Sequence, residues 1–103
     1  MTSITTTALK EKLQQQPNTI LLDVREPDER AAFNIGGIFI PLGQIMSLQI
    51  DELEAHKNDE IICYCRSGKR SMQAAFMLEA MGFSNLVNVE GGMLAWEANG
   101  FIL

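Results

Sequence analysis

Short apolar runs alternate along the chain with segments whose apolar residues recur at helical spacing. The runs cover residues 19–24, 38–40, 60–65 and 85–89, and turn-forming or charged residues bound each of them, which is typical of strands. A short extended piece is also expected near Ile4. Because strands that alternate with helices form mostly parallel sheets covered on both faces, the pattern predicts an α/β fold.

Helix signals separate the strands. Thr5 is placed to cap a helix over about residues 6–15, in which two leucines four positions apart share one face. A second helix is expected to open with residues 26–29, where proline and acidic side chains suit the first turn, and to stop at Gly36-Gly37.

The middle of the chain has a weaker helical pattern. It predicts a helical stretch from Leu42 to about Lys57, with Ile45, Leu48 and Leu53 facing inward. The remaining helices are expected to end at Gly82 and to cover residues 93–99.

Length and cysteine content indicate one ordinary globular domain over residues 1–103. The chain has 103 residues, of which 47% are apolar, so it can bury one hydrophobic core without metal or disulfide cross-links. It has only two cysteines, which excludes a small secreted scaffold held by several disulfides.

The charge balance bears on the partners. Thirteen acidic residues against eight basic ones give a net charge of −5, which argues against a nucleic-acid or anionic-membrane binder, because both need a basic face. The first residues lack the basic and apolar regions of a secretory signal, and no apolar run approaches the roughly 20 residues of a membrane span. A cytoplasmic protein is therefore expected.

One loop concentrates positive charge beside a cysteine. Cys65 falls where a strand ends and a helix is about to start, and three of the eight basic residues, Arg66, Lys69 and Arg70, follow it. Gly68 would let the loop curl tightly, so that its backbone N–H groups surround the sulfur. Ligands of parallel sheets bind beyond the carboxyl ends of the strands, so this loop is the candidate anion site.

The expected consequence is a lowered pKa of the Cys65 thiol. Backbone dipoles and guanidinium groups stabilise the thiolate, which is the nucleophilic form, more than the thiol. The substrate should be small, anionic and electrophilic at an atom that sulfur attacks, a description that sulfane sulfur and phosphate esters both fit. The alternative, a cysteine that only fills the core, does not explain a basic loop that contains glycine.

Cys63 and His56 carry weaker signals. Cys63 lies in mid-strand on the same face as Cys65, which predicts a structural role. The alternatives are a resolving thiol or a Cys63–Cys65 disulfide, for which an extended backbone places the two Cα atoms near the upper limit. His56 is the only histidine and is expected at a solvated helix end, so no zinc-type ligand spacing is present, and no metal or cofactor is expected.

The sequence of this loop resembles the Cys-x-x-Gly-x-Arg active loop of the rhodanese-like single-domain sulfurtransferases. Three further stretches are similar to the opening, middle and closing signatures of that family, namely residues 21–29, 40–42 and 90–96. The likeness covers nearly the whole chain in the family's order. It implies a single rhodanese-like domain with a twisted, mostly parallel five-stranded sheet flanked by helices.

The resemblance also implies a reaction in two halves. The Cys65 thiolate would attack the outer sulfur of thiosulfate or of a persulfide donor, releasing sulfite or a thiol and leaving a Cys65 persulfide. Cyanide, a small thiol or a protein cysteine would then accept the sulfur, which predicts ping-pong kinetics.

The loop residues have expected roles in this reaction. The three basic side chains would draw the anionic donor, with Arg70 in direct contact because its fork can grip two oxygens. Ser71 is expected to cap the following helix. Asp23 and Arg25 end a neighbouring strand and are expected to form a structural salt bridge that supports the loop. The expected substrate-binding set is Arg66, Ser67, Gly68, Lys69, Arg70 and Ser71.

One feature departs from the family pattern. Many relatives have a histidine where this chain has Asn34, before the Ile35-Gly36-Gly37 turn. Any help from that imidazole in orienting the neighbouring loop is therefore absent.

Two other functions remain open. A phosphatase or arsenate reductase of the same fold would use Cys-x5-Arg, but the sixth position after Cys65 is Ser71, and Tyr64 rather than histidine precedes the cysteine. The tighter loop suits one sulfur atom better than a phosphoryl group. A sulfur-relay or docking module would instead hand the persulfide to a protein partner, which an exposed single-loop site would allow.

Overall fold

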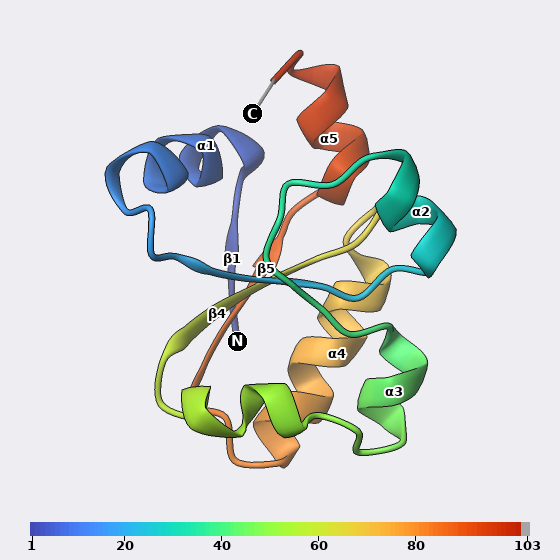
Figure 1. Cartoon of the computed structure of the whole chain (residues 1–103). Coiled ribbons are helices and arrows are strands. Elements are labelled where there is room, and N and C mark those ends of the chain that lie inside the picture. Colours follow the sequence, from blue (N-terminus) through green and yellow to red (C-terminus); the bar gives the residue numbers. More distant parts are fainter. Residues whose placement is uncertain (102–103) are drawn as a thin grey trace.

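Five parallel strands form one sheet in the computed structural model, which describes residues 1–101. Their order across the sheet is β1-β5-β4-β2-β3, so β4 lies at the centre (Figure 1). The strands are β1 (Thr2–Ile4), β2 (Ile20–Asp23), β3 (Ile38–Phe39), β4 (Glu60–Tyr64) and β5 (Asn85–Val89). The α/β class and the parallel sheet that the sequence predicts are confirmed.

Helices cover both faces of this sheet (Figure 1). One face packs against α1 (Thr6–Gln15) and α5 (Gly92–Ala98). The other face packs against α3 (Leu42–Met46), a 3₁₀ helix η1 (Asp51–His56) and α4 (Lys69–Ala80). A further short helix, α2 (Pro27–Ala32), follows the carboxyl end of β2. None of the described helices is long and apolar enough to cross a bilayer.

Alternation along β4 divides the core between these two layers. Ile61 and Cys63 point to the side of α4, and Cys65 follows them, whereas Ile62 and Tyr64 point to the side of α1 and α5. All five are at most 1% exposed. Successive strand residues face opposite sides, so a sheet that is covered on both faces needs an unbroken apolar run.

The first helix forms as the sequence predicts. Thr5 precedes α1 in an extended conformation, and its hydroxyl accepts a hydrogen bond of 3.1 Å from the backbone N–H of Ala8. This cap satisfies one of the free N–H groups of the first turn.

The prediction of one helical stretch from Leu42 to Lys57 is wrong in part. The segment divides into α3 and η1, and Leu48, which was expected to face inward, is 64% exposed with a φ of 63°. Ile45 and Leu53 are fully buried as predicted. The left-handed turn at Leu48 redirects the chain and brings Ile50 into the core in its place.

Helix α2 ends earlier than predicted, at Ala32 rather than at Gly36-Gly37. Phe33 is already extended. The Asn34 side chain then closes a local turn, donating to the Arg30 carbonyl and accepting from the Gly36 N–H. These side-chain bonds to the backbone compete with further helix growth.

Candidate active site

Cys65 immediately follows β4, and the chain curls around its sulfur before α4 begins. The Gly68 N–H donates to Sγ at 3.1 Å, and the N–H and hydroxyl of Ser71 both lie 3.4 Å from it. Gly68 has a φ of 97°, in the left-handed region that favours glycine, and it precedes the first residue of α4. The loop amides are therefore directed at the sulfur.

The sequence predicts that Ser71 caps α4, and this prediction is wrong. Gly68 is the N-cap, and Ser71 is a buried residue inside the first turn of the helix. Its hydroxyl is also within hydrogen-bond distance of Oδ1 of Asn88, so its single proton is shared between that oxygen and Sγ, and the Asn88 amide donates to the Gly68 carbonyl at 3.2 Å. Since α4 starts three residues earlier than a cap at Ser71 predicts, Ser71 turns toward the sulfur, and Asn88 contacts the loop at Gly68 and Ser71.

The pKa of the Cys65 thiol is lowered from its ordinary value, in the direction predicted. Burial alone would raise it, but hydrogen bonds from the Ser71 side chain and backbone and from the Gly68 and Ser67 N–H groups outweigh burial. The main cause is thus hydrogen bonding to the thiolate, from the backbone N–H groups that the sequence suggested and from the Ser71 hydroxyl, rather than the guanidinium charges that it also suggested.

The Cys65 sulfur is buried beneath the loop that surrounds it. Cys65 is only 1% exposed and packs among the apolar residues on the α4 side of the sheet. Burial strengthens each hydrogen bond to the thiolate, because water does not compete for the donors.

The three basic side chains of the loop differ in their partners. Both terminal nitrogens of Arg70 bind the Glu29 carboxylate, at 2.7 and 2.8 Å. Arg66 and Lys69 are exposed and have no ion-pair partner among residues 1–101. Arg70, which the sequence predicts to contact the donor directly, is therefore already bound to Glu29.

The two unpaired cations border separate hollows beside the loop. Lys69 lines one of about 560 Å³ together with Ser67, Gly68 and Asn88. Arg66 lines a smaller one, of about 190 Å³, between α2 and α5. Each hollow therefore has a basic side chain beside the loop, together with carboxylates, namely Glu90 in the first and Glu29 and Glu97 in the second.

Asp23 and Arg25 form a buried ion pair at the end of β2. Nε and Nη2 of Arg25 each lie 2.9 Å from the Asp23 carboxylate, and Arg25 also donates to the Phe33 carbonyl. Arg30 completes the cluster by bonding Asp23 and the Gly37 carbonyl. The predicted salt bridge is present. This cluster connects α2 to the turn that follows the helix, and Glu29 of α2 in turn contacts Arg70 of the cysteine loop.

Helix α5 supports the other side of the loop. The N–H groups of Met93 and Leu94 donate to the carbonyls of Cys65 and Arg66, both at 2.9 Å. Gly92 makes this approach possible, because a Cβ there would overlap the Cys65 carbonyl oxygen and lie 2.6 Å from that of Arg66. The sequence predicted only a turn at Gly91-Gly92.

Sequence reasoning missed Glu29, Asn88 and Gly92 as parts of this site. The sequence did hold a signal for Asn88, since it is a polar residue between Val87 and Val89 in a strand of a sheet expected to be covered on both faces. Glu29 was expected only to complement the helix dipole of α2, and its contact with Arg70 spans 41 positions of the sequence. Such a contact follows from the fold and has no local pattern.

Cys63 and His56 lie away from this chemistry. Cys63 is fully buried, and burial raises the pKa of its thiol to about 12, in agreement with a structural role. Both cysteines are free. His56 lies at the end of η1, where Nδ1 is 3.0 Å from a carboxylate oxygen of Asp59.

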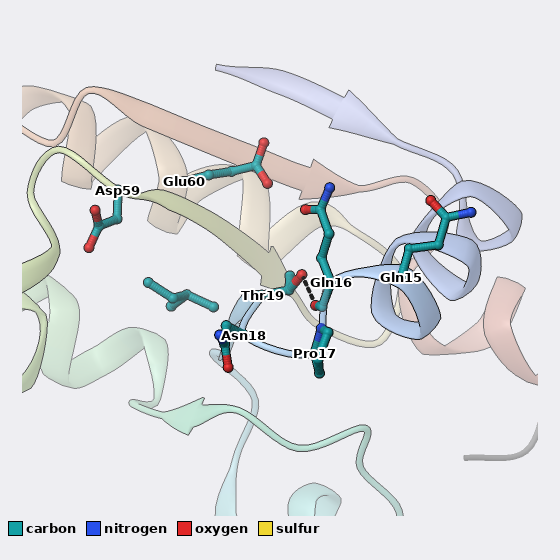
Figure 2. Close-up of a pocket in the computed structure, with 8 residues that line it drawn as sticks. Gln15, Gln16, Pro17, Asn18, Thr19, Asp59 and Glu60 are labelled. Atoms are coloured by element: carbon teal, nitrogen blue, oxygen red, sulfur yellow. Dashed lines mark hydrogen bonds between the residues drawn. The ribbon is translucent and has the colours of Figure 1, made fainter.

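Another hollow, of about 580 Å³, lies at the opposite end of the sheet, where β2 and β4 begin (Figure 2). Its lining side chains do not converge on one point, and Asp59 lies far from Gln15 in Figure 2. Glu60 is paired with Lys12 at 2.7 Å. The charged loop and the nucleophile are at the other end, so the candidate site is the Cys65 loop.

Comparison with known proteins shows the family to which the chain belongs. Residues 5–99 match the family model of the rhodanese-like domain. The chain is 43% identical over 95 residues to the "putative sulfurtransferase" YtwF of Bacillus subtilis, covering 91% of this chain and 88% of that one. It is 31% identical over 94 residues to a sulfurtransferase of Allochromatium vinosum, covering 90% and 85%. The crystal structure of a rhodanese-like domain protein from Staphylococcus aureus superimposes with a TM-score of 0.79 at 39% identity, covering 93% and 91%. The chain therefore belongs to the rhodanese-like domain family, and its relatives include sulfurtransferases.

Proposed function

We propose that this protein transfers sulfane sulfur through a persulfide on Cys65. The observation that carries the proposal is the set of donors around one sulfur, in which Gly68 and Ser71 hydrogen-bond to Sγ. A thiolate held this way is ionised more readily than an ordinary cysteine. It is the only free thiol of the described residues with a lowered pKa, since that of Cys63 is raised.

The first half-reaction charges the cysteine. With thiosulfate as donor, Sγ forms a bond to the outer sulfur, the bond between the two sulfur atoms of thiosulfate breaks, and sulfite leaves with the electron pair. With a persulfide donor, a thiolate leaves instead. The negative charge moves to the outer sulfur of the new persulfide, where loop amides and the nearby cations Arg66 and Lys69 stabilise it.

The second half-reaction discharges the persulfide. A thiophilic acceptor attacks the outer sulfur, and the Cys65 thiolate leaves. The acceptors that we propose are cyanide, a small thiol or the cysteine of a protein partner. Because the thiolate is stabilised by its hydrogen bonds, it is both the attacking group of the first step and a good leaving group in the second.

Phosphoryl transfer fits the loop less well. The position that a Cys-x5-Arg phosphatase needs for its arginine is Ser71, which turns inward to the sulfur and Asn88. Arg70, one position earlier, is held by Glu29. The guanidinium group at the last position of the loop is therefore not free to grip the oxygens of a bound phosphate.

Intact mass spectrometry tests the proposal. After incubation with thiosulfate or a persulfide donor, the protein should gain the mass of one sulfur atom and lose it again on addition of cyanide. A sulfur adduct that cyanide does not remove but a protein thiol does would indicate a module that hands its sulfur to a protein partner. Absence of any sulfur adduct with every donor, together with hydrolysis of an aryl phosphate, would contradict sulfur transfer.

A further inference from the structure

An ion pair connects the cysteine loop to the neighbouring helix α2. The Glu29 carboxylate binds Nη1 of Arg70 at 2.7 Å and Nη2 at 2.8 Å, so both oxygens and both terminal nitrogens are engaged. The pair is partly shielded, with the side chains 33% and 23% exposed for Arg70 and Glu29. This bidentate geometry is the one in which a guanidinium would also bind a donor's oxygens.

The carboxylate of Glu29 is fixed from a second direction. Its Oε1 accepts the Glu26 N–H at 3.0 Å in the capping box of α2, so the side chain cannot easily swing away. Hydrogen bonding to Arg70 also lowers the pKa of Glu29 to about 2, which leaves it ionised at every pH at which the protein would be assayed. Arg70 therefore faces a permanent competitor for any anion.

We propose that Glu29 selects sulfur donors by their charge, disfavouring dianionic thiosulfate relative to monoanionic donors, and this rests on the proposed function of Cys65. A dianion that approaches the loop must either displace Glu29 from Arg70 or tolerate its negative charge nearby. A donor with a single charge, such as a persulfide anion, meets weaker repulsion and can use Arg66 or Lys69 alone. The natural donor class that follows is a monoanionic persulfide.

Glu29 acts in this proposal through Arg70 and does not touch the reacting sulfur. Both donors undergo the same displacement, in which Sγ takes the outer sulfur. Thiosulfate releases sulfite, and methanethiosulfonate, a monoanion, releases methanesulfinate. The number of bonds and the total charge balance in each case, and because the leaving groups differ, the change in the ratio of the two rates on replacing Glu29, rather than the ratio itself, reports donor charge.

The variant Glu29→Gln tests the proposal, with the rate constant of persulfide formation measured at low donor concentration. Glutamine keeps an oxygen for the Glu26 N–H, so the cap of α2 survives while the charge and one bond to Arg70 are lost. We expect the rate constant with thiosulfate to rise about fivefold and that with methanethiosulfonate to change less than about twofold, given the modest strength of partly exposed ion pairs. The gain should appear in the donor KM rather than in the rate of discharge to cyanide.

Two controls separate this effect from general changes. Asp28→Asn removes an equal charge from the adjacent position of α2, where Asp28 forms no ion pair with any residue that the structure describes, and it should change neither donor by more than about twofold. Adding Arg70→Ala to Glu29→Gln should abolish the gain with thiosulfate. Should Glu29→Gln fail to fold, Glu29→Ala removes the same carboxylate and should give the same donor difference.

The outcomes distinguish failure of donor selection by Glu29 from failure of the proposed sulfur transfer. If the wild-type protein forms no persulfide with any donor, the proposed function fails. If it does, but Glu29→Gln leaves thiosulfate unchanged or changes both donors equally, sulfur transfer stands and selection by Glu29 is wrong. An equal slowing with both donors would indicate that Glu29 only supports the loop.

Discussion

Replacing Cys65 with alanine is expected to abolish sulfur transfer, whereas replacing Cys63 with alanine should leave the rate within about threefold of wild type. Both thiols are buried on the same face of the sheet, but their surroundings differ. Three hydrogen-bond donors face Sγ of Cys65, while burial holds the pKa of Cys63 at about 12 and keeps it a neutral thiol. Only a thiolate attacks a sulfane sulfur at a useful rate.

The measurement is turnover from thiosulfate or methanethiosulfonate to cyanide, with thiocyanate as product. We expect a fall of more than about 10³-fold for Cys65→Ala, because the variant has no group that can carry the sulfur. Cys63→Ala should lose only about 1–2 kcal/mol of unfolding free energy from the small cavity it leaves. If Cys65→Ala retained turnover, or if a folded Cys63→Ala protein lost it, the assignment of Cys65 as the nucleophile would be wrong.

Replacing Gly92 with alanine should both destabilise the fold and disable the site. The residue has a φ of 54°, in the left-handed region, which costs a residue with a side chain roughly 1–2 kcal/mol. The added Cβ would also overlap the carbonyl oxygens of Cys65 and Arg66, and relieving such overpacking typically costs about 1–3 kcal/mol more. We expect a loss of about 3 kcal/mol, measured by urea or thermal unfolding.

Gly100→Ala provides the matched control. Gly100 has a similar φ of 67°, but apart from its two chain neighbours no atom of the described residues lies within 4 Å of the position its Cβ would take. It should therefore lose only the backbone contribution of about 1 kcal/mol and keep full activity. If the two variants were equally stable and equally active, the contact of α5 with the cysteine loop would not matter for the site.

Much of the fold is encoded locally. The apolar run before Cys65 predicts a strand buried on both faces, and Thr5 predicts the start of α1, because alternation and capping act over a few residues. Where local signals are weak, the prediction fails. The stretch around Leu48 has no strong cap or period, so packing rather than propensity determines where the chain turns.

The site divides in the same way. The loop with Cys65, Gly68 and its three cations is contiguous in sequence, so its position at a strand-to-helix junction and the lowered pKa of the thiol were predictable. The inward turn of Ser71 depends on a helix boundary, which differs by three residues from the predicted one. The contacts made by Glu29 and Asn88 join distant segments, and they require the tertiary structure.

Ionisation of Cys65 also predicts how stability depends on pH. Its pKa is lower in the folded protein than in the unfolded chain, where it is about 8.5. The unfolded chain therefore binds more protons between the two values, and the stability that the thiolate contributes rises with pH through this window. This contribution to stability is fully present above the pKa of the unfolded chain, and it is lost as the pH falls through the pKa of the folded protein.

Titration of the thiolate, followed by its far-ultraviolet absorbance in the wild-type protein, Cys65→Ala, Cys63→Ala and Ser71→Ala, tests the central claim most directly. The structure predicts one cysteine that ionises below the ordinary thiol pKa, present in Cys63→Ala, absent in Cys65→Ala and shifted upward in Ser71→Ala, which lacks one donor to the sulfur. A wild-type protein in which no thiol ionises below the ordinary value would contradict the claim that the loop holds Cys65 as a thiolate.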